Sequence, residues 1–305
     1  MDDSTDPRVV SLLPSATEIV YELGVEPVAT SHECDHPPAA AELPSVVSSR
    51  IDADASSAEI DAQVLEAGDV YEIDRETLAA VDPKFVISQG ICEVCAVDTV
   101  VVREAIDELG LDCELLTTDP HSVDDVLGDV ERIGDALGRR TRAESVVSEL
   151  EARIAAVESR TERSERRPTV VVLDWLDPVM VAGHWVPELV ESAGGRYPLA
   201  APGDASTPRE WAEIRRADPD VLVAAPCGFD LEQTFENIVD VADRPGFESL
   251  RAVRNGRVHA VDGHHLMNRP GPRVVDTLET LASIVHPDLF DPTEEWTTAP
   301  LFAPA

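Results

Sequence analysis

The chain has 305 residues, enough for two domains with sizeable cores, and its hydrophobic content of 43% is ordinary for a globular protein. Its charge is not ordinary, because 24 basic residues against 60 acidic ones give −36, and Lys84 is the only lysine. A surface of this sign argues against nucleic acid as a partner. Acidic residues spread along the whole chain are typical of proteins adapted to high salt, where a short Debye length screens self-repulsion.

The first residues, 1–6, are acidic and lead straight into an apolar run. They contain no charged n-region, no apolar h-region and no lipobox cysteine. Nowhere does an apolar run approach the roughly 18 residues that span a bilayer. We therefore expect a soluble, cytoplasmic protein, or an extracytoplasmic one if the true start lies upstream. Cysteines in a cytoplasmic protein are more often reduced thiols or ligands than disulfides.

The first half of the chain predicts alternating strands and helices. The apolar run 8–13 predicts a strand, which a Pro-Ser-Ala-Thr turn and a helix at 18–23 follow. Later, a helix leads into Asp82-Pro83 and a strand at 85–88, and a final strand is expected at 114–117. Such alternation is typical of parallel βαβ units.

The second half repeats this order. We expect a strand at 169–173, a helix at 186–192, a helix that leads into Asp218-Pro219 and a strand at 221–225, and a last strand at 257–261. Between the halves, residues 141–160 predict one long helix, because apolar residues recur there at helical spacing behind a capping-box pattern.

The predicted fold class is therefore α/β, with two Rossmann-like lobes joined by one long α-helix and a ligand cleft between the lobes. The expected domains are an N-terminal lobe at 1–140, the connecting helix at 141–165, a C-terminal lobe at 166–290 and a loosely held tail at 291–305.

Four of the five cysteines follow predicted strands. They are Cys34, Cys92, Cys95 and Cys227. In open α/β sheets, ligands bind beyond the carboxyl ends of the strands, and a helix N-terminus after the Cys92–Cys95 pair favours thiolates. Four thiolates suit zinc or an iron–sulfur cluster, while a redox dithiol and simple loop packing are the alternatives.

Four segments of the chain form distinctive motifs. They are Ser31-His-Glu-Cys-Asp-His-Pro37, Gln89-Gly-Ile-Cys-Glu-Val-Cys-Ala96, Pro226-Cys-Gly-Phe229 and Asn268-Arg-Pro-Gly-Pro272. Together with the opening Arg8-Val-Val-Ser-Leu-Leu-Pro-Ser-Ala-Thr-Glu18, they resemble the helical-backbone, two-lobed substrate-binding proteins of ABC importers. Within that family they look most like the cobalamin-binding subgroup, and the acidic composition is haloarchaeal-like.

This resemblance implies a monomeric, non-enzymatic binding protein for cobalamin or a related corrinoid or metal chelate. It would serve as the solute receptor of an importer or as a cytoplasmic carrier. Members that dock on importer membrane subunits carry an exposed glutamate in each lobe. In the first lobe, Glu76 occupies the position of this docking glutamate. In the second lobe, Glu213 lies one residue away from the corresponding position.

A corrinoid is a large amphipathic disc, so its site needs apolar walls and a few placed polar groups. Trp175, Trp185 and Phe229 are candidates for the walls, with core packing as the alternative for the two tryptophans. The predicted ligand-binding residues are Ser15, Thr17, His32, Cys34, Gln89, Cys92, Cys95, Trp175, His184, Trp185, Cys227, Phe229, Asn268 and Arg269.

A second hypothesis is a cytoplasmic metalloprotein or thiol-redox protein. Here the metal ligands, for zinc or an iron–sulfur cluster, would be Cys34, Cys92, Cys95 and Cys227. Catalysis has little support in either case, because the chain contains no Gly-x-Ser-x-Gly elbow, Walker loop or His-Glu-x-x-His motif.

Overall fold

The computed structural model describes residues 7–67, 70–90, 97, 99–293 and 298–302. The chain divides into two compact units. Unit 1 consists of Met1–Asp52, Gln63–Pro120 and Asp124–Glu149, and unit 2 of Ala53–Ala62, His121–Val123 and Leu150–Ala305. The predicted domains treated the long helix as a separate connector, whereas the division between the units falls inside that helix, α6 (Arg140–Thr161).

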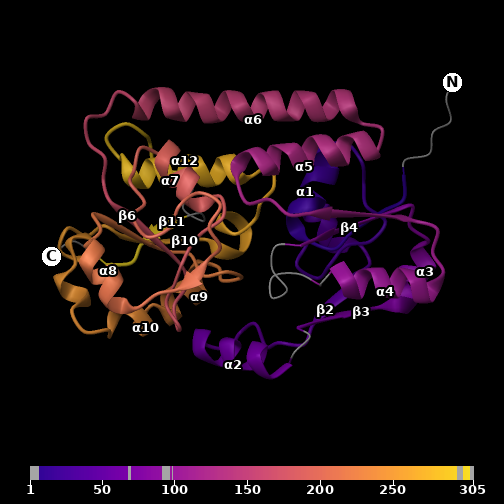
Figure 1. The fold of residues 1–305 in the computed structure, drawn as a ribbon, viewed down its shortest axis with the longest axis horizontal. Helices are drawn as coiled ribbons and strands as arrows, with labels where there is room; N and C mark the ends of the chain where they lie inside the picture. The colour runs from indigo at the N-terminus through magenta and orange to yellow at the C-terminus, as the bar shows by residue number, and fades with distance from the viewer. Residues whose placement is uncertain (1–6, 68–69, 91–96, 98, 294–297, 303–305) are drawn as a thin grey trace. The chain divides into compact units, whose positions relative to one another are not determined.

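Unit 1 contains a three-stranded parallel sheet in the order β1-β4-β5 (Figure 1). Its strands are β1 (Val9–Ser11), β4 (Phe85–Gln89) and β5 (Glu114–Thr118), and an antiparallel pair is formed by β2 (Val47–Ser49) and β3 (Tyr71–Ile73). The helices in or entering this unit are α1 (Pro14–Glu22), η1 (Pro38–Glu42), α2 (Ser57–Ala67), α3 (Arg75–Val81), α4 (Thr99–Leu109) and α5 (Val123–Ala136). Buried apolar residues of the strands, among them Val10 and Val86, pack with Val102 and Ile106 of α4 to form a core.

Two of the predicted boundaries in unit 1 are wrong. Helix α1 begins at Pro14, four residues before the expected start, because proline is favoured at the first helical position, where its missing N–H costs nothing. The helix expected directly after the Cys92–Cys95 pair begins at Thr99. Cys92 and Cys95 themselves lie outside the described residues.

Unit 2 contains a six-stranded sheet in the order β11-β10-β9-β6-β7-β8 (Figure 1). The strands are β6 (Val170–Trp175), β7 (Met180–Val181), β8 (Thr207–Pro208), β9 (Val221–Ala224), β10 (Val258–Val261) and β11 (Thr298–Pro300). The three central strands β10, β9 and β6 are parallel and mostly apolar, as strands covered on both sides should be, with His259 in β10 and Asp174 near the end of β6 as exceptions. The helices are α7 (Val186–Ser192), α8 (Trp211–Ala217), α9 (Leu231–Asn237), α10 (Val239–Ala242), η2 (Phe247–Ser249), α11 (Arg251–Arg254), η3 (Gly263–Met267) and α12 (Val274–Val285).

The expectation of a loosely held tail is wrong for Thr298–Pro300. These residues form β11, which pairs antiparallel with β10, and the Thr298 hydroxyl donates to the Ala260 carbonyl at 2.8 Å. Proline is tolerated on an edge strand, because only one side of that strand is hydrogen-bonded.

Both units make the same turn from a helix into a strand. Helix α3 ends at Asp82 and α8 ends at Asp218, and each aspartate has φ +41° and ψ 65° and is followed by proline. Aspartate tolerates the left-handed region better than most residues, and proline prevents the helix from continuing. The predicted similarity of the two halves is confirmed at this corner.

Helix α6 carries the predicted long connection, and its second half is anchored on unit 2. The guanidinium of Arg153 forms ion pairs with Asp276 and Glu279 of α12, at 2.5 and 2.7 Å. Among the described residues, no helix is both long and apolar enough to cross a membrane.

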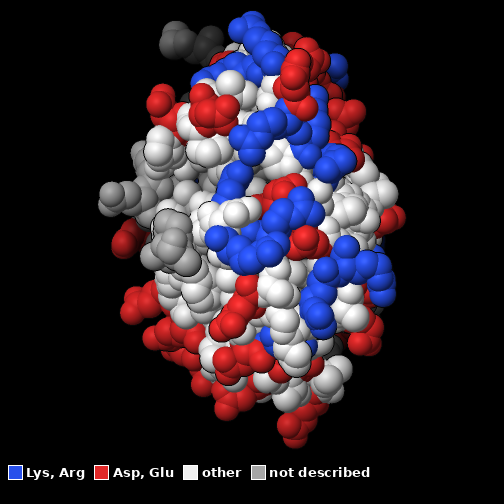
Figure 2. Space-filling model, turned by 90° about the vertical axis from the view of Figure 1, so that its left-hand side faces the viewer, with Lys and Arg blue, Asp and Glu red and all other residues white. Residues whose placement is uncertain are grey.

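Arginine side chains gather on one face of the molecule, as Figure 2 shows. Within unit 2, Arg167 and Arg196 line the same surface hollow. Nearby, burial and then the positive charge of Arg166 lower the pKa of Arg257. This local clustering of arginines contrasts with the net charge of −36.

Because the carboxylates repel one another, we expect the thermal midpoint of unfolding to rise when KCl is raised. The Debye length shortens from roughly 10 Å near 0.1 M salt to roughly 3 Å near 1 M. Differential scanning fluorimetry across this range, with sucrose of equal osmolality as a control for preferential exclusion, measures the effect. A midpoint that rises equally in sucrose, or not at all in KCl, contradicts the prediction.

Candidate ligand-binding site

Three parallel strands of unit 2 end side by side. Strands β10, β9 and β6 are neighbours in the sheet, so the loops that follow them meet at one edge. The Cys227 backbone N–H donates to the Asp174 carbonyl at 3.0 Å, and the rings of Trp175 and Phe229 lie 5.4 Å apart. The structure thus brings together three residues that the sequence predicted for the ligand site, namely Trp175, Cys227 and Phe229.

The loop after β10 packs tightly on the loop after β9. The backbone N–H groups of Gly263 and His264 both donate to the Phe229 carbonyl at 2.9 Å. A Cβ on Gly263 would lie 2.0 Å from the Pro226 carbonyl oxygen, so only glycine fits there. The Asn268 amide donates to the carbonyls of Ala225 and Gly263 at 3.0 and 3.1 Å. Asn268 therefore fixes the two loops to each other.

Two polar atoms at the end of β6 have no hydrogen-bond partner among the described residues. They are Oδ1 of Asp174, an acceptor, and Nε1 of Trp175, a donor, and both are inaccessible to solvent. Burial raises the pKa of Asp174 to about 6, although the Ser206 hydroxyl opposes this by hydrogen bonding to the carboxylate. Unpaired buried polar groups cost roughly 1–3 kcal/mol each, so these two atoms lower the stability of this strand end.

His184 occupies a strained position before α7. Its φ of +53° is rare for a residue with a side chain, and the backbone is held there by Asp204, whose carbonyl accepts from the His184 N–H at 2.6 Å. Nδ1 of the His184 ring lies 3.1 Å from Nδ1 of His121. Its neighbour Trp185 is buried, and the indole N–H donates to the Met267 carbonyl at 3.3 Å. Packing of this kind satisfies Trp185 without a ligand.

In unit 1, predicted ligand-binding residues after β1 form hydrogen bonds with other buried residues of the same unit. The Thr17 hydroxyl lies 2.8 Å from the Ser11 hydroxyl and 3.1 Å from the Cys34 thiol, and all three side chains are buried. Ser31 also reaches the Cys34 sulfur, at 3.2 Å. Cys34 thus belongs to a small buried polar cluster, and Ser15 is buried nearby in the first turn of α1.

His32 and Gln89 are the remaining predicted residues of unit 1. Burial works to lower the pKa of His32, but the hydrogen bond and charge of Glu33, with the Val47 carbonyl, raise it above its ordinary value. Gln89 is the last residue of β4, and its carbonyl accepts from the Thr99 hydroxyl at 2.8 Å. Arg269 of unit 2 is 5% exposed, on the loop between η3 and α12. The ligand role of each of these residues stays a prediction, as does the cleft that involves both units.

The predicted four-thiolate metal site also stays a prediction. Cys34 belongs to unit 1 and Cys227 to unit 2, and Cys92 and Cys95 lie outside the described residues. The two residues predicted to dock on an importer also stay predictions. Glu76 is exposed in the first turn of α3, whereas Glu213 caps α8, because its carboxylate accepts from the Glu210 N–H at 3.1 Å.

Two residues of this edge were missed from the sequence. Asp174 follows the apolar residues of β6, and Asp262 follows those of β10. A carboxylate where an apolar strand ends was therefore the sequence signal that could have identified both residues. Asp262 accepts from the backbone N–H of His265 at 2.5 Å and lies 2.9 Å from Nδ1 of the same residue. A side-chain contact of this kind has no signature in residue spacing.

Comparison with known proteins gives the same architecture. The chain is 25% identical over 291 residues to a cobalamin-binding protein of Halobacterium salinarum, covering 93% of this chain and 70% of that protein. It is 23% identical over 295 residues to the uncharacterized ABC transporter substrate-binding lipoprotein YvrC of Bacillus subtilis, covering 93% and 81%. In fold it resembles a periplasmic heme-binding protein from Pseudomonas aeruginosa, with a TM-score of 0.74 at 21% identity, over 99% of this chain and 100% of that one.

The family model described as periplasmic binding protein matches residues 9–264, well over half of the chain. The match runs from β1 to η3 and so takes in the strand ends of both units. The chain belongs to the periplasmic binding protein family.

Proposed function

We propose that this protein is the substrate-binding protein of an ABC importer, that it acts outside the cytoplasmic membrane, and that its cargo is cobalamin or a related corrinoid. Membership of the periplasmic binding protein family supports a solute-binding role without catalysis. The names of the two relatives, a cobalamin-binding protein and an ABC transporter lipoprotein, support the cargo and the importer. The heme-binding protein of similar fold makes haem the competing cargo to be tested.

The observation that carries the proposal is the group of side chains at the ends of β6 and β9. Trp175 and Phe229 supply aromatic surface, and beside them lie a donor, Trp175 Nε1, and an acceptor, Asp174 Oδ1, for which the described part of the chain offers no partner. A corrinoid has an apolar ring and a rim of amides, each of which both donates and accepts. If ligand binding opens this strand end, such a rim can pair with both atoms, which solvent does not reach here, whereas a purely apolar ligand would leave them unpaired.

Titration of the purified protein with cyanocobalamin tests the proposal. We expect saturable quenching of tryptophan fluorescence at micromolar ligand and tighter binding of cobalamin than of haem. Trp175→Ala should weaken cobalamin binding at least tenfold, which corresponds to about 1.4 kcal/mol, because it removes both ring surface and the donor. Trp175→Phe keeps the ring and separates the two contributions.

Trp211→Phe is the matched control. Trp211 of α8 stacks on Phe247 of η2, and its indole N–H donates to the Pro245 carbonyl at 3.1 Å. Its replacement should leave cobalamin affinity unchanged. An absence of saturable binding in high salt refutes the corrinoid reading, and a preference for haem moves the proposed cargo to haem.

A further inference from the structure

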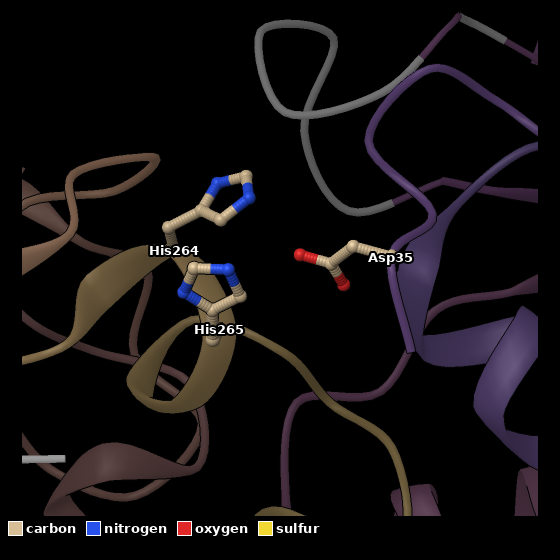
Figure 3. A group of neighbouring side chains, drawn as sticks. All are labelled: Asp35, His264 and His265. Carbon is tan, nitrogen blue, oxygen red and sulfur yellow. The ribbon is translucent and has the colours of Figure 1, made fainter. Parts of the chain in front are cut away.

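The turn that follows β10 is unusual in its geometry. Residues Gly263–Met267 form one π-helical turn, η3, a conformation found frequently at functional sites. Asp262 caps this turn, and its side chain is 5% exposed, against 37% for His265. Figure 3 shows the rings of His264 and His265 projecting from the turn. The strand end therefore presents two imidazoles above one buried carboxylate.

The carboxylate determines which nitrogen of His265 carries the proton. Oδ2 of Asp262 lies 2.9 Å from Nδ1 of His265, and Oδ1 accepts from the His265 backbone N–H at 2.5 Å. An ionised carboxylate only accepts hydrogen bonds, so Nδ1 is the protonated nitrogen and Nε2 carries the lone pair. Proteins orient metal-binding histidines in this way, with a carboxylate on the nitrogen that does not bind the metal.

The second imidazole lies beside the first. The ring centroids of His264 and His265 are 4.4 Å apart with an interplanar angle of 85°, and a nitrogen of each ring lies within 4.8 Å of a nitrogen of the other. The backbone beneath them is held by the two N–H bonds to Phe229 and by the absence of space at Gly263. Two imidazoles at this separation on a fixed backbone need only side-chain rotation to share one ion.

We propose that His264 and His265, with Asp262 positioning His265, form a binding site for a first-row transition-metal ion. Imidazole nitrogen is a preferred ligand of Zn²⁺, Co²⁺, Ni²⁺ and Cu²⁺, and solvent completes the coordination shell. The site uses no thiolate and does not depend on the identity of the cargo. Asp35, which Figure 3 also draws, belongs to unit 1 and is not part of this proposal.

Titration of the metal-free protein with Co²⁺ tests the site, because the spectrum reports both affinity and ligand type. We expect visible d–d bands without strong near-ultraviolet thiolate charge transfer. The double variant His264→Gln/His265→Gln should abolish these bands. Asp262→Asn should weaken Co²⁺ binding about 10- to 100-fold, the usual effect of losing a carboxylate behind a metal-binding histidine. His259→Gln, which removes a part-buried histidine of β10 that belongs to no predicted site, is the matched control and should leave Co²⁺ binding unchanged.

Asp262 is buried, so its variant needs a readout that separates folding from metal binding. His265→Gln alters a side chain that is more exposed, and its unfolding midpoint without metal should equal that of the parent. If Asp262 acts through His265, adding Asp262→Asn to His265→Gln should weaken Co²⁺ binding no further. Unchanged Co²⁺ affinity in the double histidine variant overturns the proposal. So does a spectrum dominated by thiolate charge transfer that survives in that variant, since it assigns the ion to cysteines.

Discussion

Gly263→Ala is expected to destabilise the protein by roughly 1–3 kcal/mol and to disturb the turn after β10. The added methyl would lie 2.0 Å from the Pro226 carbonyl oxygen and 2.9 Å from the Ala225 carbonyl carbon. Both are backbone atoms, which cannot rotate away as a side chain would. The turn must therefore move off the loop after β9, and the bonds from Gly263 and His264 to Phe229 are lost with it. The midpoint of urea unfolding measures the loss.

Gly128→Ala is the matched control and should have the opposite sign. Gly128 lies inside α5 with a φ that is not positive, and beyond its own helix backbone no described residue comes within 4 Å of the position of its added Cβ. Alanine at an exposed position in a helix is favoured over glycine by up to about 1 kcal/mol. If Gly263→Ala is as stable as the parent, the two loops are not packed as described. If both variants lose stability alike, the loss is not specific to the turn.

The strands and helices that the sequence predicted well are those with buried, apolar sequences and clear ends. Helix α7 spans the predicted residues 186–192, because its apolar face is followed by the Gly194-Gly195 pair. The strands at 85–89 and 221–224 follow an Asp-Pro corner whose backbone permits little else. Local signals of this kind are strong enough to identify an element without its neighbours.

Elements that depend on a distant partner were not predictable. Strands β7 and β8 have two residues each, and β11 exists only because β10 has a free side for it to pair with. The same difference between local and distant signals applies to the candidate site. Trp175 and Phe229 could be predicted as site residues, because the ends of apolar strands can be located from the sequence. The contact between Asp262 and His265 depends on the π-turn, and the contact between Thr17 and Cys34 joins residues 17 apart in the sequence.

Asp174→Asn is expected to stabilise the protein near pH 7 by up to about 3 kcal/mol. Burial raises the pKa of Asp174 to about 6 in the folded protein, from an ordinary value of 3.8. The folded state therefore binds the proton more tightly, so the stabilisation is fully present below about pH 3.8 and is lost as pH rises through 6. The gap between these two pKa values corresponds to about 3 kcal/mol. Asparagine carries no charge at any pH and so avoids this cost.

His259 of β10 opposes Asp174 in the same pH window. Burial, followed by the charge of Arg257, lowers the pKa of His259 to about 4 from an ordinary value of 6.5. The folded state therefore favours the neutral ring, which contributes stability above about pH 6.5 that is lost as pH falls through 4. Between pH 4 and 6, acid thus strengthens the fold through Asp174 and weakens it through His259. In the unaltered protein the two effects largely cancel.

Each single substitution should expose the other group. In urea unfolding from about pH 3.5 to 7, the advantage of Asp174→Asn over the parent should grow from near zero to about 3 kcal/mol. His259→Gln should show its advantage at the acidic end instead, because glutamine does not have to accept a buried charge. The double variant should recover a pH profile of the same shape as that of the parent, since the two opposing effects are removed together. An Asp174→Asn advantage that is the same at every pH would mean that the carboxyl is not buried as an acid, and that the end of β6 tolerates a charge without a partner.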